Sequence, residues 1–487
     1  MTKVTHEKQR NYKMPEQQTH EGAIMRELSL KDENAKMPTT VDPEVSNCHP
    51  PKEVDDDLTD DGDGDDDPSE RFAEVLANLN QEMVPHLALA VRRKLDPDAG
   101  HNCPVVGEPV HGSFNILFPL DFEDGIRWMI KFPITGVEGK WDHMAANSLT
   151  TEANTMRLLK KETTIPLPEV YDFSSTTDNI VGCPYILMSH ISGLSLYEVW
   201  FGQHLRGVDP ETLRAHRTRA LDGIAAAMAQ LERYSFMSSG SVLFDSNGRP
   251  TGLGSKRLLD SQAMIDRWWV HKDPCEDLLY VEQPPTTDVG SFYTFTMDHR
   301  ETKQSYGKGA EMLLRQMISW IPEPLNLEPF VLAHPDFNFN NIIVSRSIGN
   351  VSYPSWLTRD WDLLMYSYKE SMDAGVEPVG VWEDSPDTLK HYRDVYCQSV
   401  SKVRGEGTFQ ETTRRSLITG NLAIAADDSQ VRLHILIKIA GESFGDPDDE
   451  GFLRCMDLIH GLADDEVDES EMAKLKEGFM GLLDESL

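Results

Sequence analysis

Apolar positions at the start of the patterned chain follow first a helical and then a strand-like period. The stretch SERFAEVLANLNQEMVPHLALAV begins with Ser69, a candidate N-cap, and predicts one helix that opens the folded part. Its helically spaced apolar residues are Phe72, Val75, Leu76, Leu79 and Met83. The next stretch, GSFNILFPLDFEDGIRWMIKFP, has two apolar runs around the turn Glu123-Asp124-Gly125, which predicts a β-hairpin.

The remaining patterns change from mixed to mainly helical. TEANTMRLLKKETTIP predicts a helix stopped by Pro166, and GCPYILMSHISG predicts a buried strand ending at Gly193. Helix signals then dominate, as in DPETLRAHRTRALDGIAAAMAQLE with Asp209 and Pro210 at its start. The order predicts an α+β fold, with a small antiparallel-sheet lobe followed by a larger, mainly helical lobe.

The first 68 residues have a different composition. They are polar and nearly free of aromatic residues, and residues 1–70 hold 19 Asp and Glu against 8 Lys and Arg. This composition predicts a disordered acidic tail. A calcium-binding loop is excluded, because with Gly62 at the turn position the twelfth position is Pro68, where a bidentate Glu is needed.

Charge and hydropathy restrict the class of protein. The 487 residues include 39% hydrophobic ones, enough for real cores, and carry a net charge of -35, which argues against nucleic acid as a partner. The mean hydropathy is -0.43, and neither an apolar span nor a secretory signal is visible, so we expect no membrane association and a cytoplasmic location. Six scattered Cys without metal-ligand spacing predict reduced thiols.

One polar segment, HPDFNFNN, lies between two apolar runs that read as short buried strands. His334 and Asp336 are followed by Asn341, and Asp360 comes at the end of a further apolar run, YPSWLTRDWD, also read as a strand. Phosphoryl transfer needs a carboxylate beside the attacking hydroxyl and oxygen ligands for magnesium. The spacing His-x-Asp-x-x-x-x-Asn, followed by an acidic residue, could supply both.

These motifs resemble the aminoglycoside phosphotransferase and choline kinase-like family, especially its fungal members, which has a two-lobed protein-kinase-like fold. The turn GSFN, followed by Trp128 and Lys131, resembles the hairpin that covers the nucleotide in that family. Glu152 lies where the family pairs a Glu with the basic residue, and PYILMSHISG resembles the hinge that binds adenine. The resemblance covers about residues 100 to 365.

The resemblance implies an ATP- and Mg²⁺-dependent phosphotransferase acting on a hydroxyl group of a small molecule. It implies Asp336 as catalytic base and His334 as the residue that braces the loop, with Asn341 and Asp360 as magnesium ligands. Lys131 would hold the phosphates, oriented by Glu152. The other nucleotide contacts that it implies are Gly112, Ser113, Asn115, Ser189 and Ile191.

The predicted lobes follow from these assignments. The nucleotide-binding lobe with its preceding helix covers residues 69–190, and the helical lobe with the catalytic loop and acceptor site covers residues 191–487. The acidic surface would suit a cationic acceptor. The oligomeric state is not predicted.

Two other classes of function compete with this interpretation. Arg359 precedes Asp360 where the family has an apolar residue, and the following segment LLMYSYKESMDAGVEP departs from the family, which favours a pseudokinase-like binding or scaffold protein. Separately, Gly441-Glu442-Ser443-Phe444-Gly445 fits the nucleophile elbow of hydrolases, after the run VRLHILIKIA that could be a strand. The alternative there is a helix that ends at Gly441, and too little chain follows for the rest of a hydrolase.

Overall fold

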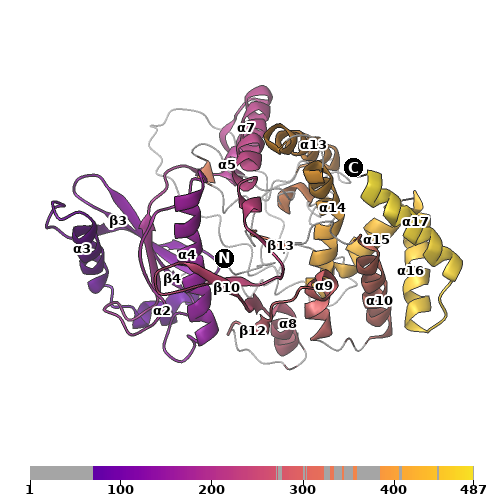
Figure 1. The fold of residues 1–487 in the computed structure, drawn as a ribbon, viewed down its shortest axis with the longest axis horizontal. Coiled ribbons are helices and arrows are strands. Elements are labelled where there is room, and N and C mark those ends of the chain that lie inside the picture. The colour runs from indigo at the N-terminus through magenta and orange to yellow at the C-terminus, as the bar shows by residue number, and fades with distance from the viewer. Residues whose placement is uncertain are drawn as a thin grey trace, which may run out of the picture.

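The fold has a small antiparallel sheet at one end and a larger, mainly helical part at the other, as Figure 1 shows. It is two-lobed and of the α+β class that the sequence predicts. The structure, a computed structural model, describes residues 70–269, 271, 277–299, 302, 304–322, 330–333, 343–344, 355–358, 384–404, 408–446 and 449–485. The boundaries predicted for the tail and the lobes are not tested and remain predictions.

The sheet of the first lobe is built around the predicted hairpin. β3 pairs antiparallel with β4, and the spatial order is β1-β3-β4-β6-β5, with β2 also on β3. Along β3 the buried residues alternate, so one face of the strand packs on the core. Gly125, with φ 83°, forms the predicted turn. The strands are β1 (Val105–Val106), β2 (Val110–His111), β3 (Asn115–Asp121), β4 (Arg127–Pro133), β5 (Val170–Ser174) and β6 (Tyr185–Ser189).

The first predicted helix is broken in the structure. A 3-10 turn, η2 (Glu70–Phe72), leads into α2 (Ala73–Asn78), and a second helix, α3 (Met83–Leu95), follows. Leu79 is extended with ψ 120°, and the N–H of Asn80 donates to Val181 O at 2.9 Å. The prediction of one continuous helix is therefore wrong, because the chain turns here to bond the loop before β6. The apolar side chains still pack with the sheet.

The helix between β4 and β5 begins earlier than predicted. α4 (His143–Glu162) includes residues before Thr151, because Asp142 caps it by accepting from Ala145 N at 2.7 Å. It ends at Glu162, ahead of Pro166, as predicted. A strand, a long helix and two further strands thus complete the first lobe.

The second part contains the predicted helix, α7, with Asp209 Oδ1 accepting from Thr212 N at 3.0 Å. It also contains two small antiparallel strand pairs that the sequence patterns did not predict, the hairpin of β9 and β10 and the pair of β11 and β12, which α8 separates along the chain. The elements before the predicted catalytic loop are β7 (Leu194–Ser195), α5 (Leu196–Trp200), α6 (Gly202–Arg206), α7 (Pro210–Met228), η3 (Leu231–Arg233), β8 (Ser235–Phe236), β9 (Ser241–Phe244), β10 (Pro250–Gly254), β11 (Lys256–Leu259), α8 (Ser261–Trp269), β12 (Tyr280–Gln283), α9 (Val289–Asp298) and α10 (Ser305–Trp320).

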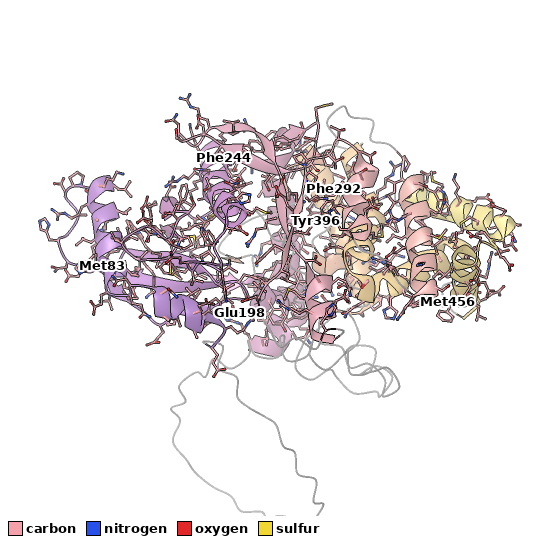
Figure 2. The ribbon with its side chains drawn as sticks, turned by 90° about the horizontal axis from the view of Figure 1, so that it is seen from below. Met83, Glu198, Phe244, Phe292, Tyr396 and Met456 are labelled. Carbon is pink, nitrogen blue, oxygen red and sulfur yellow. The ribbon has the colours of Figure 1, made fainter. Side chains whose placement is uncertain are left out.

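The later elements form most of the helical core. They are β13 (Phe330–Val331), β14 (Ile343–Val344), η5 (Ser355–Thr358), α13 (Pro386–Arg404), α14 (Thr408–Asp427), α15 (Ser429–Phe444), α16 (Asp449–Ala463) and α17 (Glu469–Glu485). Residues of α10 and α14 to α17, among them Leu313, Leu436 and Phe479, share one buried cluster. In Figure 2 this part, marked by Met456, lies at the opposite end from Met83 of the first lobe.

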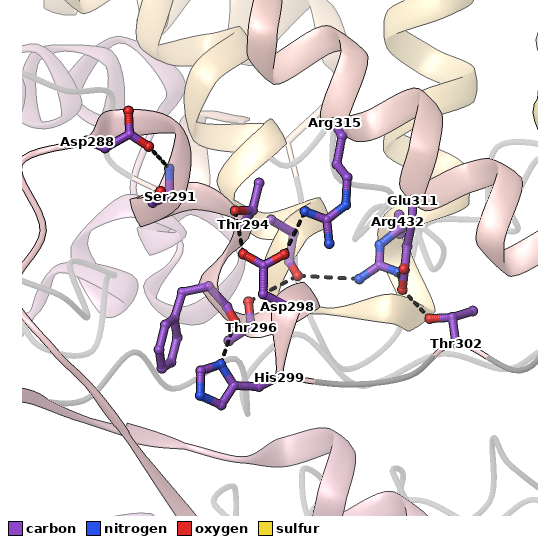
Figure 3. A network of polar contacts seen from close by, with 12 residues as sticks. Asp288, Ser291, Thr294, Thr296, Asp298, His299, Thr302, Glu311, Arg315 and Arg432 are labelled. Atoms are coloured by element: carbon purple, nitrogen blue, oxygen red, sulfur yellow. Dashed lines mark hydrogen bonds and ion pairs between the residues drawn. The ribbon is translucent and has the colours of Figure 1, made fainter.

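A buried arginine joins the helices at one side of that core (Figure 3). Arg432 Nη1 lies 2.9 Å from Glu311 Oε1, and Arg432 Nε donates to Ala425 O at 2.8 Å. Nearby, Arg315 and Asp298 form a more exposed ion pair at 2.7 Å. Because the guanidinium of Arg432 is both charge-paired and hydrogen-bonded, its burial is compensated.

A second polar centre joins α5, α7 and α13. Arg217 Nη1 lies 3.0 Å from Asp384 Oδ1, and Trp200 Nε1 donates to Asp384 Oδ2 at 2.5 Å. Leu357 of η5 is fully buried in the same cluster, and its carbonyl accepts from Arg393 Nη1 at 2.6 Å. This cluster therefore fixes the chain immediately before the predicted metal ligand Asp360.

The possible nucleophile elbow is part of a helix. Ser443 lies within α15, and its Oγ donates to Ile439 O at 2.6 Å. α15 continues to Phe444 and ends at Gly445, with φ 72°. The alternative, a helix, is confirmed, although it ends at Phe444 and not at Gly441. The strand considered for VRLHILIKIA is wrong, and without a strand before it Ser443 does not have the setting of a hydrolase nucleophile.

Two other expectations can be compared with the described part of the chain. The four cysteines found there, Cys103, Cys183, Cys397 and Cys455, are free. None of the helices described has both the length and the apolar character needed to cross a bilayer.

Candidate functional site

The centre of the candidate site is an ion pair between Lys131 and Glu152. Lys131 is on β4, an inner strand of the sheet, and Glu152 is on α4, the helix that follows. Lys131 Nζ contacts Glu152 Oε1, and their side chains are 12% and 35% exposed. A strand Lys paired with a Glu of the next helix is the arrangement that holds nucleotide phosphates in protein kinases.

The GSFN turn lies at the same end of the sheet. It connects β2 to β3, and Asn115, its last residue, pairs with Pro133 two residues after Lys131. The turn is tight, because Gly112 N donates to Asn115 O at 2.9 Å and a Cβ at Gly112 would lie 3.3 Å from that oxygen. Ser113 is part of the turn, and its carbonyl accepts from Arg71 Nη2 at 3.4 Å.

Two backbone N–H groups of the predicted hinge are already hydrogen-bonded to neighbouring strands or their ends. The N–H of Ser189 donates to Glu169 O at 2.9 Å, and that of His190 donates to Arg127 O at 3.2 Å. Within the described residues, the N–H of Ile191 has no backbone acceptor. Of the hinge residues, Ile191 thus offers the N–H that a purine base could use. Burial, assisted by Arg127, lowers the pKa of His190, so its imidazole is neutral at neutral pH.

The predicted catalytic residues lie between two anchored strands in sequence. β13 pairs with β8, and β14 pairs with β7 directly after the hinge. Both apolar runs form strands as predicted, although Val331 is 53% exposed, so the prediction of burial is wrong there. The predicted site residues His334, Asp336, Asn341 and Asp360 lie outside the described residues, and their placement remains a prediction.

The run before Asp360 does not form the strand that was predicted. Ser355–Thr358 is the 3-10 helix η5. Leu357 packs among the helices, where Arg393 bonds its carbonyl, so this backbone is not part of a sheet. This described stretch therefore ends in a helical turn two residues before Asp360. Among the described residues, no cluster of three or more His, Cys, Asp or Glu could hold a metal ion.

The structure adds a cation that no sequence pattern indicated. Lys256 Nζ lies 4.9 Å from the ring centroid of Phe292, and that ring meets Phe330 of β13 at 5.6 Å. Burial lowers the pKa of the Lys256 amine, and Asp427 partly opposes this effect. Lys256 is on β11, in the second of the unpredicted strand pairs. The Asn247-Gly248 dipeptide, a strong turn signal, could have revealed the first pair, the hairpin of β9 and β10.

Comparisons with known proteins find only limited similarity. No family model matches the chain. A protein named "Subtelomeric hrmA-associated cluster protein", from each of two strains of Aspergillus fumigatus, is 34% identical over 98 residues, which cover 20% of this chain. The match spans only 18% of the length of these curated relatives.

Two similar solved structures are those of small-molecule kinases. A thermostable mutant of aminoglycoside phosphotransferase APH(4)-Ia, in the apo form, is 13% identical with a TM-score of 0.34, covering 77% of this chain and 98% of its own. The amicoumacin kinase hAmiN, in complex with AMP-PNP, Ca²⁺ and Ami, is also 13% identical, with a TM-score of 0.38 and coverage of 81% and 96%. Both TM-scores are below 0.5, so the fold assignment stands on the topology and the Lys131–Glu152 pair of this chain.

Proposed function

We propose that the protein is an ATP- and Mg²⁺-dependent phosphotransferase that transfers the γ-phosphate to a hydroxyl group of a small molecule. The observation that carries the proposal is the ion pair between Lys131 and Glu152, next to the GSFN turn. A partly buried Lys held by a carboxylate keeps a fixed cation for an anionic ligand. Neither residue belongs to the buried hydrophobic clusters described for the first lobe.

The described residues fit the phosphates of ATP. Glu152 engages one side of the Lys131 ammonium, which has three donors, so others can meet phosphate oxygens. The turn at Gly112 brings backbone close to Lys131 without a side chain at that position. Asn341 and Asp360 would hold Mg²⁺, since amide and carboxylate oxygens suit this ion, which would neutralise phosphate charge.

The residues of the chain then divide the work of the reaction. Lys131 binds and orients the phosphates, and Glu152 fixes the Lys131 side chain. Asp336 accepts the proton of the acceptor hydroxyl as its oxygen attacks, and His334 braces the loop that carries Asp336. A cationic acceptor would suit the net charge of -35, and we propose a cytoplasmic location.

The test is transfer of labelled γ-phosphate from ATP into a metabolite extract. We expect a labelled product with magnesium, and a fall in rate of about 10²- to 10⁴-fold for Asp336→Asn. Asp178→Asn, in an exposed loop, is the matched control and should keep the activity. No labelled product and no nucleotide turnover from the unaltered chain would contradict the proposal.

A second candidate is a nucleotide-binding protein with little or no turnover. Arg359 directly follows the 3-10 helix η5, where a strand was expected to lead to Asp360. A changed backbone before a metal ligand would weaken magnesium binding without affecting Lys131. A thermal shift caused by ATP, equal with and without magnesium and accompanied by no product, would favour this candidate over the enzyme.

A further inference from the structure

The two small strand pairs between β8 and α9 belong by sequence to the second part but pack on the helix that carries Glu152. β9 and β11 both contact α4. Thr151 Oγ1 donates to Val242 O of β9 at 2.9 Å, and both residues are buried. Thr151 directly precedes Glu152, and adjacent helical residues point about 100° apart. One residue is therefore fastened to the hairpin while the next meets Lys131.

Further contacts hold α4 along its length. A Cβ at Gly248, in the turn between β9 and β10, would lie 3.2 Å from the Oδ1 of buried Asn154, so this turn lies directly against the helix. At the start of α4, Arg257 Nη2 is 3.9 Å from the capping residue Asp142. Lys140, just before the helix, forms an ion pair with Asp277 at 2.7 Å.

The same segment also holds the GSFN turn. Phe114, at the tip of the turn, is 6% exposed and lies in a hydrophobic cluster with Leu259 and Met264. Leu259 is the last residue of β11, and Met264 is on α8. The GSFN turn, which faces the predicted nucleotide, and α4, which carries Glu152, thus both pack against the segment from β9 to β12.

We infer that the residues of this segment, β9 to β12 with α8, act as a built-in positioning module for the Lys131–Glu152 pair. Thr151 is the positioning residue on α4, and Phe114 is the positioning residue on the turn. The inference rests on the proposed function, in which this pair binds ATP. In protein kinases the placement of the corresponding helix controls activity, and here the chain supplies its own support for that helix.

The orientation of α4 depends on this support because the ion pair is only partly shielded from water. Glu152 is 35% exposed, so water competes for its carboxylate. The buried bond from Thr151 to Val242 O is shielded from water, and its loss leaves a buried carbonyl without that donor. A small rotation of α4 then separates Glu152 from Lys131.

The test uses Thr151→Val, which keeps the shape and removes the donor, and Thr151→Ser, which restores a hydroxyl. The first readout is the rate at which an amine-reactive N-hydroxysuccinimide ester labels Lys131 in the full-length protein, followed by mass spectrometry. We expect Thr151→Val to raise this rate by about 3- to 10-fold, with Lys94 on α3 unchanged, and Thr151→Ser to restore it. The second readout is the KM for ATP, which should rise by a similar factor with a smaller change in kcat.

The matched control is Thr150→Val. Thr150 Oγ1 donates to Ala146 O at 2.8 Å within α4 itself, so this variant removes a hydroxyl from the same helix without touching β9. Should Thr151→Val fail to fold, Asp277→Asn weakens the exposed ion pair with Lys140 while the ion pair between Lys140 and Glu74 stays in place, and it should raise the labelling rate of Lys131 by a smaller factor.

The outcomes separate the two proposals. Equal labelling of Lys131 in Thr151→Val, Thr150→Val and the unaltered chain would overturn the inference, as would an unchanged KM for ATP. If the unaltered chain neither binds nor turns over ATP, the proposed function fails, but the labelling rates still decide whether the segment positions the ion pair.

Discussion

At the scale of single residues, Arg92 shows how the hairpin of the first lobe is fixed. Its guanidinium is buried on α3, lies 4.2 Å from the ring centroid of Phe122, and donates from Nη1 to Asp124 Oδ1 at 3.0 Å. Asp124 belongs to the turn between β3 and β4. The hydrogen bond from Arg92 lowers the pKa of Asp124, although desolvation opposes it.

This shift predicts a pH-dependent contribution to stability. Because the pKa of Asp124 is lower in the folded than in the unfolded protein, its stabilising effect is complete above the unfolded pKa and is lost as the pH falls through the folded pKa. Asp124→Asn should lower the free energy of unfolding at pH 7, and the difference should be smaller at pH 3, which is below the unfolded pKa of about 4. Urea unfolding at both pH values checks this.

Asp98→Asn, an exposed site after α3, is the control for that measurement. It should leave the free energy of unfolding within about 0.5 kcal/mol at both pH values. If Asp124→Asn lowers the free energy of unfolding by as much at pH 3 as at pH 7, the loss comes from altered packing in the variant and not from the missing charge.

The same scale shows why part of the candidate site was readable. Lys131 and Glu152 were found because motif order along the chain specifies them, and the structure brings their side chains together. The role of Thr151 was missed, because the acceptor of its hydrogen bond is the backbone carbonyl of Val242, which lies far along the chain and which no local pattern identifies. Ser443 was a candidate from spacing alone. The short chain after it already argued against a hydrolase, and its place in α15 removes the strand that the motif needs.

At the scale of elements, helix ends follow local chemistry when a side chain or a glycine sets them. Asp209 caps α7, and Gly445 ends α15 with φ 72°. A Cβ at Gly445 would meet nothing within 4 Å, so only backbone conformation opposes a side chain there.

Two glycine variants should therefore shift stability in opposite directions. Gly445→Ala should lower the free energy of unfolding by about 1–2 kcal/mol, because an L-residue is strained at this positive φ. Gly481→Ala, within α17 and also with open space around its Cβ, should raise it by about 0.5–1 kcal/mol. Chemical denaturation of both variants beside the unaltered protein tests the pair, and equal signs would contradict this account.

The sequence predicted helices and strands less well where their ends depend on contacts with residues far along the chain. The break between α2 and α3 comes from the bond of Asn80 to Val181 O, and Ser355–Thr358 is helical where Leu357 is drawn into the helical core. In both cases the local apolar pattern is compatible with a longer helix or a strand. Contacts with residues far along the chain decide between them.

At the scale of the whole molecule, the order of the two lobes was predictable, because a change from strand-like to helical periodicity is a property of long stretches. The packing of β9 to β12 on α4 was not, because it crosses between the lobes. The acidic excess is also a property of the whole chain, with a net charge of -35. The excess carboxylates repel one another in the compact folded state, and this repulsion lowers its stability.

That repulsion predicts stabilisation by salt. Raising NaCl from about 20 to 300 mM shortens the Debye length from roughly 20 Å to 6 Å, so repulsion between distant carboxylates is screened and Tm should rise. Choline chloride at equal ionic strength should give the same increase, since the effect is one of screening. A Tm that is constant or falls in both salts would mean that attractive ion pairs outweigh the repulsion.

The pairing of β14 with β7 has a consequence for the order of folding. Val344 and Leu194 are paired although they are separated by on the order of 150 positions, so closing this contact carries a large loop-closure entropy. Contacts of high sequence separation form late and slow the folding of a domain. During synthesis, β1 to β6 all leave the ribosome well before Val344, so β14 can pair with β7 only after every strand of the first sheet has been made.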